Sequence, residues 1–175
     1  PFDPEFLFSN NITPLIIGPK ARHPLLFVTW FELSLPPVLN RLNPDLFLSP
    51  DGYLSLRAKG PCLPVIHDIN FFHNPENLSK INATYYNYFF PKFAKKASRI
   101  ATVSEFSKSD ISKNYQINPE MIDVVYNGVN DEFRPLSPSR IKEVRDKWTY
   151  GFPYFFFVGS LQPRKNIAGL IKAFE

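Results

Sequence analysis

The chain has 175 residues, of which 44% are hydrophobic and 21% are charged. This composition is typical of a folded globular protein and excludes a disordered chain. The net charge is only +4 and the basic residues are scattered, so the charge does not indicate a nucleic-acid partner. No apolar run approaches the roughly 20 residues of a membrane-spanning helix. Cys62 is the single cysteine, which excludes an internal disulfide and a thiolate metal cluster.

Short apolar runs alternate with segments of helical periodicity along most of the chain. This alternation predicts an α/β fold, a Rossmann-like parallel sheet with flanking helices. The residues before 25 are expected to form mostly loop. The strands are expected at residues 25–30, 45–49, 63–66, 99–103 and 122–126.

Helices are expected between these strands. The first contains Leu35 to Leu42 at helical spacing and is stopped by Asn43-Pro44. A long aromatic helix over 79–97 is expected to be broken or kinked at Pro91, because proline removes a backbone donor. Packing against the sheet explains most of its aromatic residues, and a membrane surface is the alternative. A third helix begins at Ser104.

The composition of the sequence changes at Phe133, because the prolines and serines that follow favour an extended connector. We therefore expect a domain over 1–133, a linker with a connecting helix over 134–153, and the start of a second domain over 154–175. That second domain is expected to open with a strand at 154–158 and a helix from Ile167. The chain begins with Pro1 and closes within a helical pattern, so we expect it to be a fragment.

The loop between that last strand and helix concentrates candidate ligand groups. Gly159 lets the backbone turn closely, Lys165 supplies a point charge, and Arg164 can fork onto phosphate or carboxylate oxygens. The free amides and positive end of the following helix favour an anion such as phosphate. The alternative is that Arg164 and Lys165 are solvated charges in a loop before a helix and bind no ligand. The loop lacks both a dinucleotide-binding glycine pattern and a P-loop ending.

Four motifs in order resemble those of the group 1 (family 4) glycosyltransferases over residues 25–175. They are 65–71 with His67-Asp68, 101–108 with Ser104-Glu105, 124–129 with Asn127-Gly128, and 157–166 with Gly159, Arg164 and Lys165. The resemblance implies a GT-B enzyme with two Rossmann-like domains across a cleft. The acceptor would lie on the N-terminal domain and the nucleotide-sugar on the C-terminal one.

The resemblance also implies roles for individual residues. His67 would contact the donor sugar near the reacting centre, and Lys165 would face the diphosphate; these two are the catalytic candidates. Ser160 stands where many members of the family have an arginine, which leaves open whether Arg164 or the Ser160 hydroxyl substitutes. Donor contacts are expected from Gly159, Ser160, Arg164, Lys165, Asn127 and Gly128, and acceptor-side contacts from Asp51, Asp68, Ser104 and Glu105.

Several of these residues also have structural interpretations that stay open. Ser104 is a natural helix cap, Asp68 is placed to orient the loop that follows it, and Asn127-Gly128 favours a tight turn with positive φ. Asp51 belongs to a turn after the second strand.

The expected function is transfer of a sugar, with retention of configuration, from a nucleotide-sugar to a glycan or lipid-linked acceptor. The chain has no Asp-x-Asp motif, which fits a metal-independent enzyme without a cofactor. The expected location is cytoplasmic; peripheral membrane contact and a homodimer are left open. A nucleotide-sugar epimerase and a non-catalytic binding domain of the same fold are the alternatives. Residues 1–175 alone are expected to have little or no transferase activity.

Overall fold

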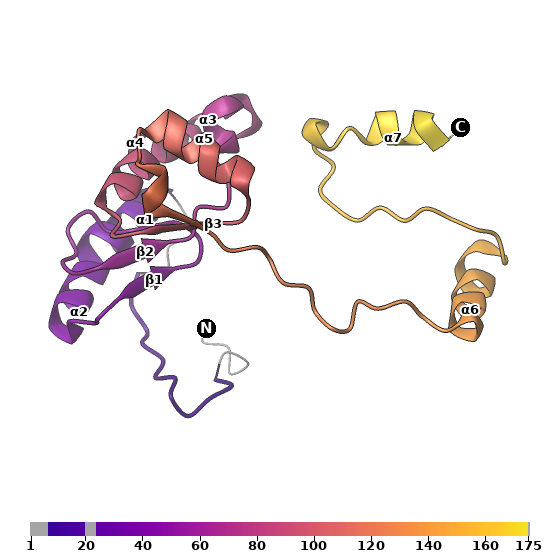
Figure 1. The fold of residues 1–175 in the computed structure, drawn as a ribbon, viewed down its shortest axis with the longest axis horizontal. Coiled ribbons are helices and arrows are strands. Elements are labelled where there is room, and N and C mark those ends of the chain that lie inside the picture. Colours follow the sequence, from indigo (N-terminus) through magenta and orange to yellow (C-terminus); the bar gives the residue numbers. More distant parts are fainter. Residues whose placement is uncertain (1–6, 20–23, 175) are drawn as a thin grey trace. The chain divides into compact units, whose positions relative to one another are not determined.

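The computed structural model describes residues 7–19 and 24–174. It forms two compact units, one of residues up to Gly128 and one from Val129 onward, and each is described here by itself. The first unit contains strands and helices, and the second contains helices joined by extended chain (Figure 1). Among the described residues, no helix is both long enough and apolar enough to cross a membrane.

The strands of the first unit are parallel, as predicted. Within the described residues they are β1 (Phe47–Ser49), β2 (Cys62–Pro64), β3 (Ile100–Thr102) and β4 (Ile122–Val124). β1 pairs with β2 and β3 pairs with β4. A parallel bridge between Val65 and Ala101 joins the two pairs, and the Ile66 amide donates to the Ala101 carbonyl at 2.9 Å. The strands therefore lie side by side in chain order.

The strand predicted at 25–30 is wrong, because this segment is helical. Helix α1 (Pro24–Thr29) continues through a π-helical turn, η2 (Trp30–Ser34), into α2 (Leu35–Leu42). A short apolar run fits a buried helix as well as a strand. On the helix, the rings of Phe27 and Phe31 both stack on Tyr53 with centroids 5.4 Å away. Helix α2 ends at Asn43, in the left-handed region, as the Asn-Pro signal predicted.

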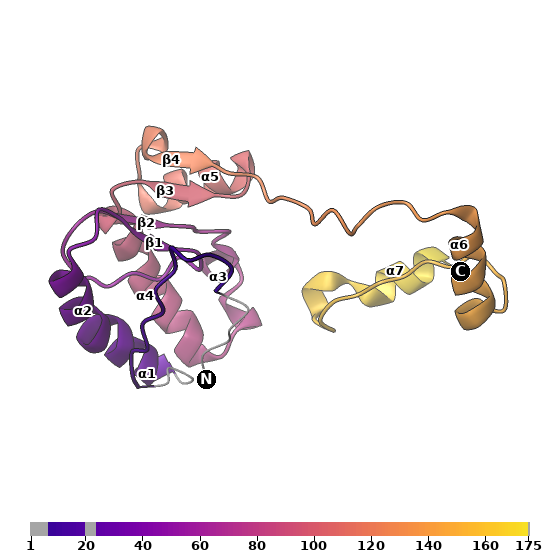
Figure 2. The ribbon, with the colours of Figure 1, turned by 90° about the horizontal axis from the view of Figure 1, so that it is seen from below.

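Helices α3 (Asn70–His73), η3 (Pro75–Asn77) and α4 (Lys80–Lys96) connect β2 to β3, and α5 (Glu105–Tyr115) and η4 (Pro119–Met121) connect β3 to β4. Of the break or kink predicted at Pro91, the break is wrong, because α4 runs without interruption through this residue. Figure 2 shows α2 and α4 on one side of β1 and β2. In this packed setting, burial of the neighbouring rings offsets the lost backbone hydrogen bond at Pro91.

The aromatic residues of α4 mainly pack into the core, as expected. Phe90 and Phe93 are buried, and Tyr85, Tyr86 and Phe89 are half-buried. Tyr88 is exposed, with the Lys92 ammonium 3.1 Å from the centre of its ring. The cluster around Phe93 includes fully buried residues from β3, β4, α5 and the loops after β1 and β2: Ile100, Ile122, Ile111, Leu54, Ile66 and Ile69.

The second unit contains α6 (Pro138–Thr149), η5 (Pro163–Lys165) and α7 (Ile167–Phe174). The strand predicted at 154–158 is wrong, because these residues form no ladder with any described segment. A strand exists only through hydrogen bonds to a neighbouring strand. Without one, Phe155 and Phe156 stay 86% and 81% exposed. Of the strand and the helix expected for the start of a second domain, only the helix, α7, is therefore formed in the part of the chain that the structure describes.

Candidate functional site

The polar candidates of the first unit follow the carboxyl ends of the strands. In a parallel sheet these ends meet at one edge, where open α/β folds place their ligands. The loops after β1, β2, β3 and β4 carry, in that order, Asp51, His67 with Asp68, Ser104 with Glu105, and Asn127 with Gly128. The fold therefore brings these loops to a common edge.

His67 is exposed, and its ring is fixed by a hydrogen bond. The Nε2 atom lies 3.0 Å from the carbonyl oxygen of Pro50, in the loop after β1. A carbonyl only accepts, so Nε2 carries the hydrogen, and in neutral imidazole Nδ1 is left as an acceptor. The preceding residue is held on the sheet, because the buried Thr102 hydroxyl donates to the Ile66 carbonyl at 2.7 Å. An imidazole held in this way can accept a hydrogen bond from a sugar hydroxyl.

The turn around Asp51 packs tightly against the β2 exit, the segment that directly follows β2 and begins at Val65. The Gly52 amide donates to the Ser49 carbonyl at 3.3 Å, and Gly52 has a φ of 78°, which favours glycine. A Cβ there would lie 3.2 Å from the Val65 carbonyl oxygen. Asp51 itself is exposed at this edge. The turn predicted at Asp51 is thus confirmed, and glycine lets it approach β2 closely.

Tyr53, directly after this turn, is held as a neutral phenol. Its hydroxyl lies 2.8 Å from that of Tyr86 on α4. Burial is the main cause that raises the pKa of Tyr53, and the Tyr86 hydrogen bond adds to it. The Tyr53 ring also packs against those of Phe27, Phe31 and Phe90, which anchors the residue that follows the turn in the core.

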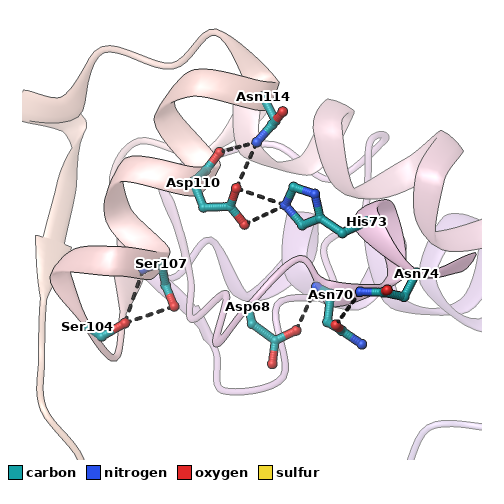
Figure 3. Close-up of polar contacts among 8 residues, drawn as sticks. All are labelled: Asp68, Asn70, His73, Asn74, Ser104, Ser107, Asp110 and Asn114. Atoms are coloured by element: carbon teal, nitrogen blue, oxygen red, sulfur yellow. Dashed lines mark hydrogen bonds and ion pairs between the residues drawn. The ribbon is translucent and has the colours of Figure 1, made fainter. Parts of the chain in front are cut away.

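Asp68 orients the start of α3, as one interpretation of the sequence proposed. Its Oδ1 accepts a hydrogen bond from the Asn70 amide at 2.9 Å (Figure 3). Asp68 is exposed, like the neighbouring His67. The carboxylate thus shapes the loop between β2 and α3.

Ser104 caps helix α5, which confirms its predicted structural role. Its Oγ accepts from the Ser107 amide at 3.1 Å and donates to the Ser107 hydroxyl at 3.0 Å (Figure 3). Glu105 lies exposed in the first turn, where the helix dipole favours a negative charge. Both side chains therefore stand at the exit of β3.

Replacing Ser104 with alanine is expected to lower the free energy of unfolding by about 1 kcal/mol, because a free amide loses its cap. Urea denaturation of the Ser104→Ala variant measures this loss. Ser109→Ala, at an exposed position further along the same helix, is the matched control and should be close to neutral. Equal stability of the two variants would contradict the capping role.

The tight turn predicted at Asn127-Gly128 is wrong. Neither residue has a positive φ, and both lie exposed in extended chain where the first unit ends. Asn-Gly permits a left-handed turn but does not impose one, and no returning strand demands it here. A donor contact from this segment remains a prediction.

The loop of the second unit leads directly into a helix, as predicted. After Gly159 and Ser160 it forms η5, turns at Asn166 with a φ of 48°, and enters α7. Arg164 donates from Nε to the Gln162 side-chain oxygen at 2.9 Å. The Lys165 ammonium makes no hydrogen bond or ion pair with any described residue and is exposed. This arrangement leaves its charge available to a ligand.

A histidine–carboxylate pair was missed from the sequence. His73 Nε2 lies 2.8 and 2.9 Å from the two carboxylate oxygens of Asp110, which also accepts from Asn114 (Figure 3). The partners are 37 residues apart and belong to α3 and α5, so no local pattern could join them. No group of three metal-binding side chains occurs within residues 7–19 and 24–174.

These features describe an α/β protein with polar loops gathered at the carboxyl edge of a parallel sheet, followed by a loop rich in cations before a helix. The sequence model of Glycosyltransferase Family 4 matches residues 1–133, and the chain belongs to this family. The resemblance drawn from the motifs is thereby confirmed.

Two curated relatives are bacterial mannosyltransferases. The chain is 28% identical over 131 residues to the O-antigen chain mannosyltransferase B of Escherichia coli, which covers 74% of the chain and 34% of the relative. It is 32% identical over 107 residues to the O-antigen chain mannosyltransferase RfbU of Salmonella typhimurium, covering 61% of the chain and 27% of the relative. The chain therefore spans about a third or less of the length of these relatives.

A solved glycosyltransferase from Rickettsia africae is also similar. The structures match with a TM-score of 0.43 and 19% identity, over 77% of the chain and 35% of the Rickettsia protein.

Proposed function

We propose that the chain belongs to an enzyme that transfers a sugar from a nucleotide-sugar to a glycan or lipid-linked acceptor, with retention of configuration. The observation that carries the proposal is the family match over 1–133, the part that places His67 at the carboxyl edge of the sheet. The names of both relatives favour mannose as the sugar and a polysaccharide chain as the product.

The chemistry requires stabilisation of a departing nucleoside diphosphate. As the bond between the sugar and the phosphate breaks, negative charge grows on the diphosphate, and fixed cations lower that barrier. The exposed Lys165 ammonium and the amino-terminal end of α7 supply positive potential in one loop. There the Gly169 amide is bonded to the Asn166 side chain, which leaves the Ile167 and Ala168 amides for a ligand. Such side-chain and backbone charges support a metal-independent mechanism.

In this proposal Arg164 and Ser160 make the further contacts with the diphosphate of the nucleotide-sugar. The Arg164 guanidinium uses Nε to hold Gln162, which leaves its terminal nitrogens to meet phosphate oxygens. The Ser160 hydroxyl follows Gly159 in the same loop and can donate to the diphosphate.

His67 binds and orients the donor sugar in the proposed reaction. Its Nε2 is engaged by Pro50, so Nδ1 accepts from a sugar hydroxyl near the reacting carbon. Asp51, Asp68, Ser104 and Glu105 stand on the loops at the same edge and are assigned to the acceptor side. The first unit thus carries the residues proposed for the acceptor, and the second carries the cations proposed for the diphosphate.

The test is a transfer assay with the complete enzyme, a nucleoside-diphosphate mannose and a lipid-linked glycan acceptor. The His67→Ala variant is expected to lower kcat/KM about 10- to 100-fold, the effect of one hydrogen bond to a reacting substrate. Asp45→Ala, ahead of β1 and away from the carboxyl edge, is the control and should keep wild-type activity.

The reaction products separate the proposal from its rivals. Labelled mannose in the acceptor supports transfer. Interconversion of the donor without an acceptor would identify an epimerase. The absence of both turnover and donor binding would identify a non-catalytic domain. An inverted linkage in the product would contradict retention.

A further inference from the structure

The pair of His73 and Asp110 joins helices α3 and α5, which follow two of the loops that carry candidate site residues. His73 is the last residue of α3, which follows the β2 exit with His67 and Asp68. Asp110 lies on α5, whose first turn carries the β3 exit residues Ser104 and Glu105. Figure 3 shows His73 and Asp110 facing each other across the space between α3 and α5.

Helix α3 depends on such contacts for its position. It has four residues, too few to be stable alone, so its surroundings decide where it lies. On the α4 side, the Phe71 ring packs 5.0 Å from Phe90 and the Asn87 amide donates to the Phe71 carbonyl. On the α5 side, the Phe72 ring meets Tyr115 at 6.4 Å and His73 meets Asp110.

The contact with Asp110 differs from the apolar ones because it is directional. Hydrophobic packing is non-directional, whereas a hydrogen bond between imidazole and carboxylate fixes both distance and angle. Asp110 has a side chain only 14% exposed and also accepts from the Asn114 amide nitrogen at 2.8 Å. The carboxylate is therefore held in place before it meets His73.

His73 is followed in the sequence by Asn74, from which two polar contacts lead back along α3 to Asp68. The Asn74 amide nitrogen donates to the Asn70 side-chain oxygen at 2.9 Å, and the Asn70 backbone amide donates to Asp68. Asp68 adjoins His67 in the sequence. These contacts link α3 to the segment that presents the imidazole of His67.

We propose that His73 and Asp110 are positioning residues that hold α3 against α5, and so hold the loop between β2 and α3 in the arrangement that aims His67 at the donor sugar. This inference rests on the proposed glycosyl transfer. Loss of the pair would leave substrate binding largely intact but misalign His67, and misplacement of reacting groups by about 1 Å can cost about 100-fold in rate.

The test compares His73→Leu, which removes the donor, with His73→Gln, which keeps an amide donor near the same place. In the complete enzyme, His73→Leu is expected to lower kcat about 10- to 100-fold with little change in KM, while His73→Gln keeps most of the activity. Hydrogen exchange of the Phe72 and Asn74 amides, which close turns of α3, should speed up in His73→Leu alone.

The matched control is Asp123→Asn, which breaks another pair across two elements. The carboxylate of Asp123, on β4, accepts hydrogen bonds from two nitrogens of the Arg99 guanidinium at 2.6 and 2.7 Å. Arg99 directly precedes β3. This variant should leave both kcat and the exchange of Phe72 and Asn74 at wild-type values.

Two results would overturn the inference. Unchanged exchange at Phe72 and Asn74 in His73→Leu would show that the pair does not hold α3. Faster exchange with an unchanged kcat would show that holding α3 does not aim His67. A wild-type enzyme without any transfer would instead overturn the proposed function, and the exchange measurements would still decide whether the pair holds α3.

Discussion

Replacing Lys165 with alanine in the complete enzyme is expected to lower kcat for sugar transfer about 100- to 1,000-fold. One preorganised donor aimed at charge that develops in the transition state has an effect of this size. The ammonium is exposed and makes no hydrogen bond or ion pair with the described residues, so the change should cost little stability. Steady-state kinetics with a nucleoside-diphosphate sugar measure it.

The control is Lys172→Ala, which removes the same charge from the last turn of α7. This variant lies at the opposite end of the helix from the proposed diphosphate contact and should keep near-normal kcat. Diphosphate binding by calorimetry gives a second reading. If Lys165→Ala keeps both turnover and diphosphate affinity, the catalytic role of the loop is wrong.

Replacing Phe93 with alanine is expected to lower the free energy of unfolding of the first unit by about 3–5 kcal/mol. Phe93 is fully buried between α4 and the sheet, and its ring contacts those of Phe89 and Phe90 at 5.7 Å. Alanine would leave a cavity in a close-packed cluster. Chemical denaturation followed by tyrosine and tryptophan fluorescence measures the loss.

Phe106→Ala is the matched comparison, because Phe106 is a phenylalanine of the same unit that is 79% exposed. It should change stability by less than about 0.5 kcal/mol. Similar losses for both variants would mean that the cluster around Phe93 is not the core of the unit.

The strands that could be predicted were those bounded by clear turn signals. The predicted strands at 45–49, 63–66, 99–103 and 122–126 are each followed directly by a proline or a polar residue, and each overlaps an observed strand. The run at 25–30 lacks such a boundary and continues into an amphipathic segment, so a helix was equally compatible. The run at 154–158 has strand composition, yet pairing depends on a neighbour that local sequence does not specify.

Of the site, local roles were predictable and long-range ones were not. The cap at Ser104 and the turn at Asp68 are hydrogen bonds over two or three residues, which a short motif encodes. The His73 contact with Asp110 depends on how α3 and α5 pack, and the His67 contact with Pro50 depends on the register of β1 and β2. No spacing in the sequence specifies either distance.

The extended aromatic segment at 154–158 has a consequence for the cations beyond it. Its peptide groups lack ladder partners among the described residues, so they are available to pair with another strand. Such pairing would set the direction in which the chain leaves Gly159, and in the proposed reaction the position of the Lys165 ammonium would follow from it.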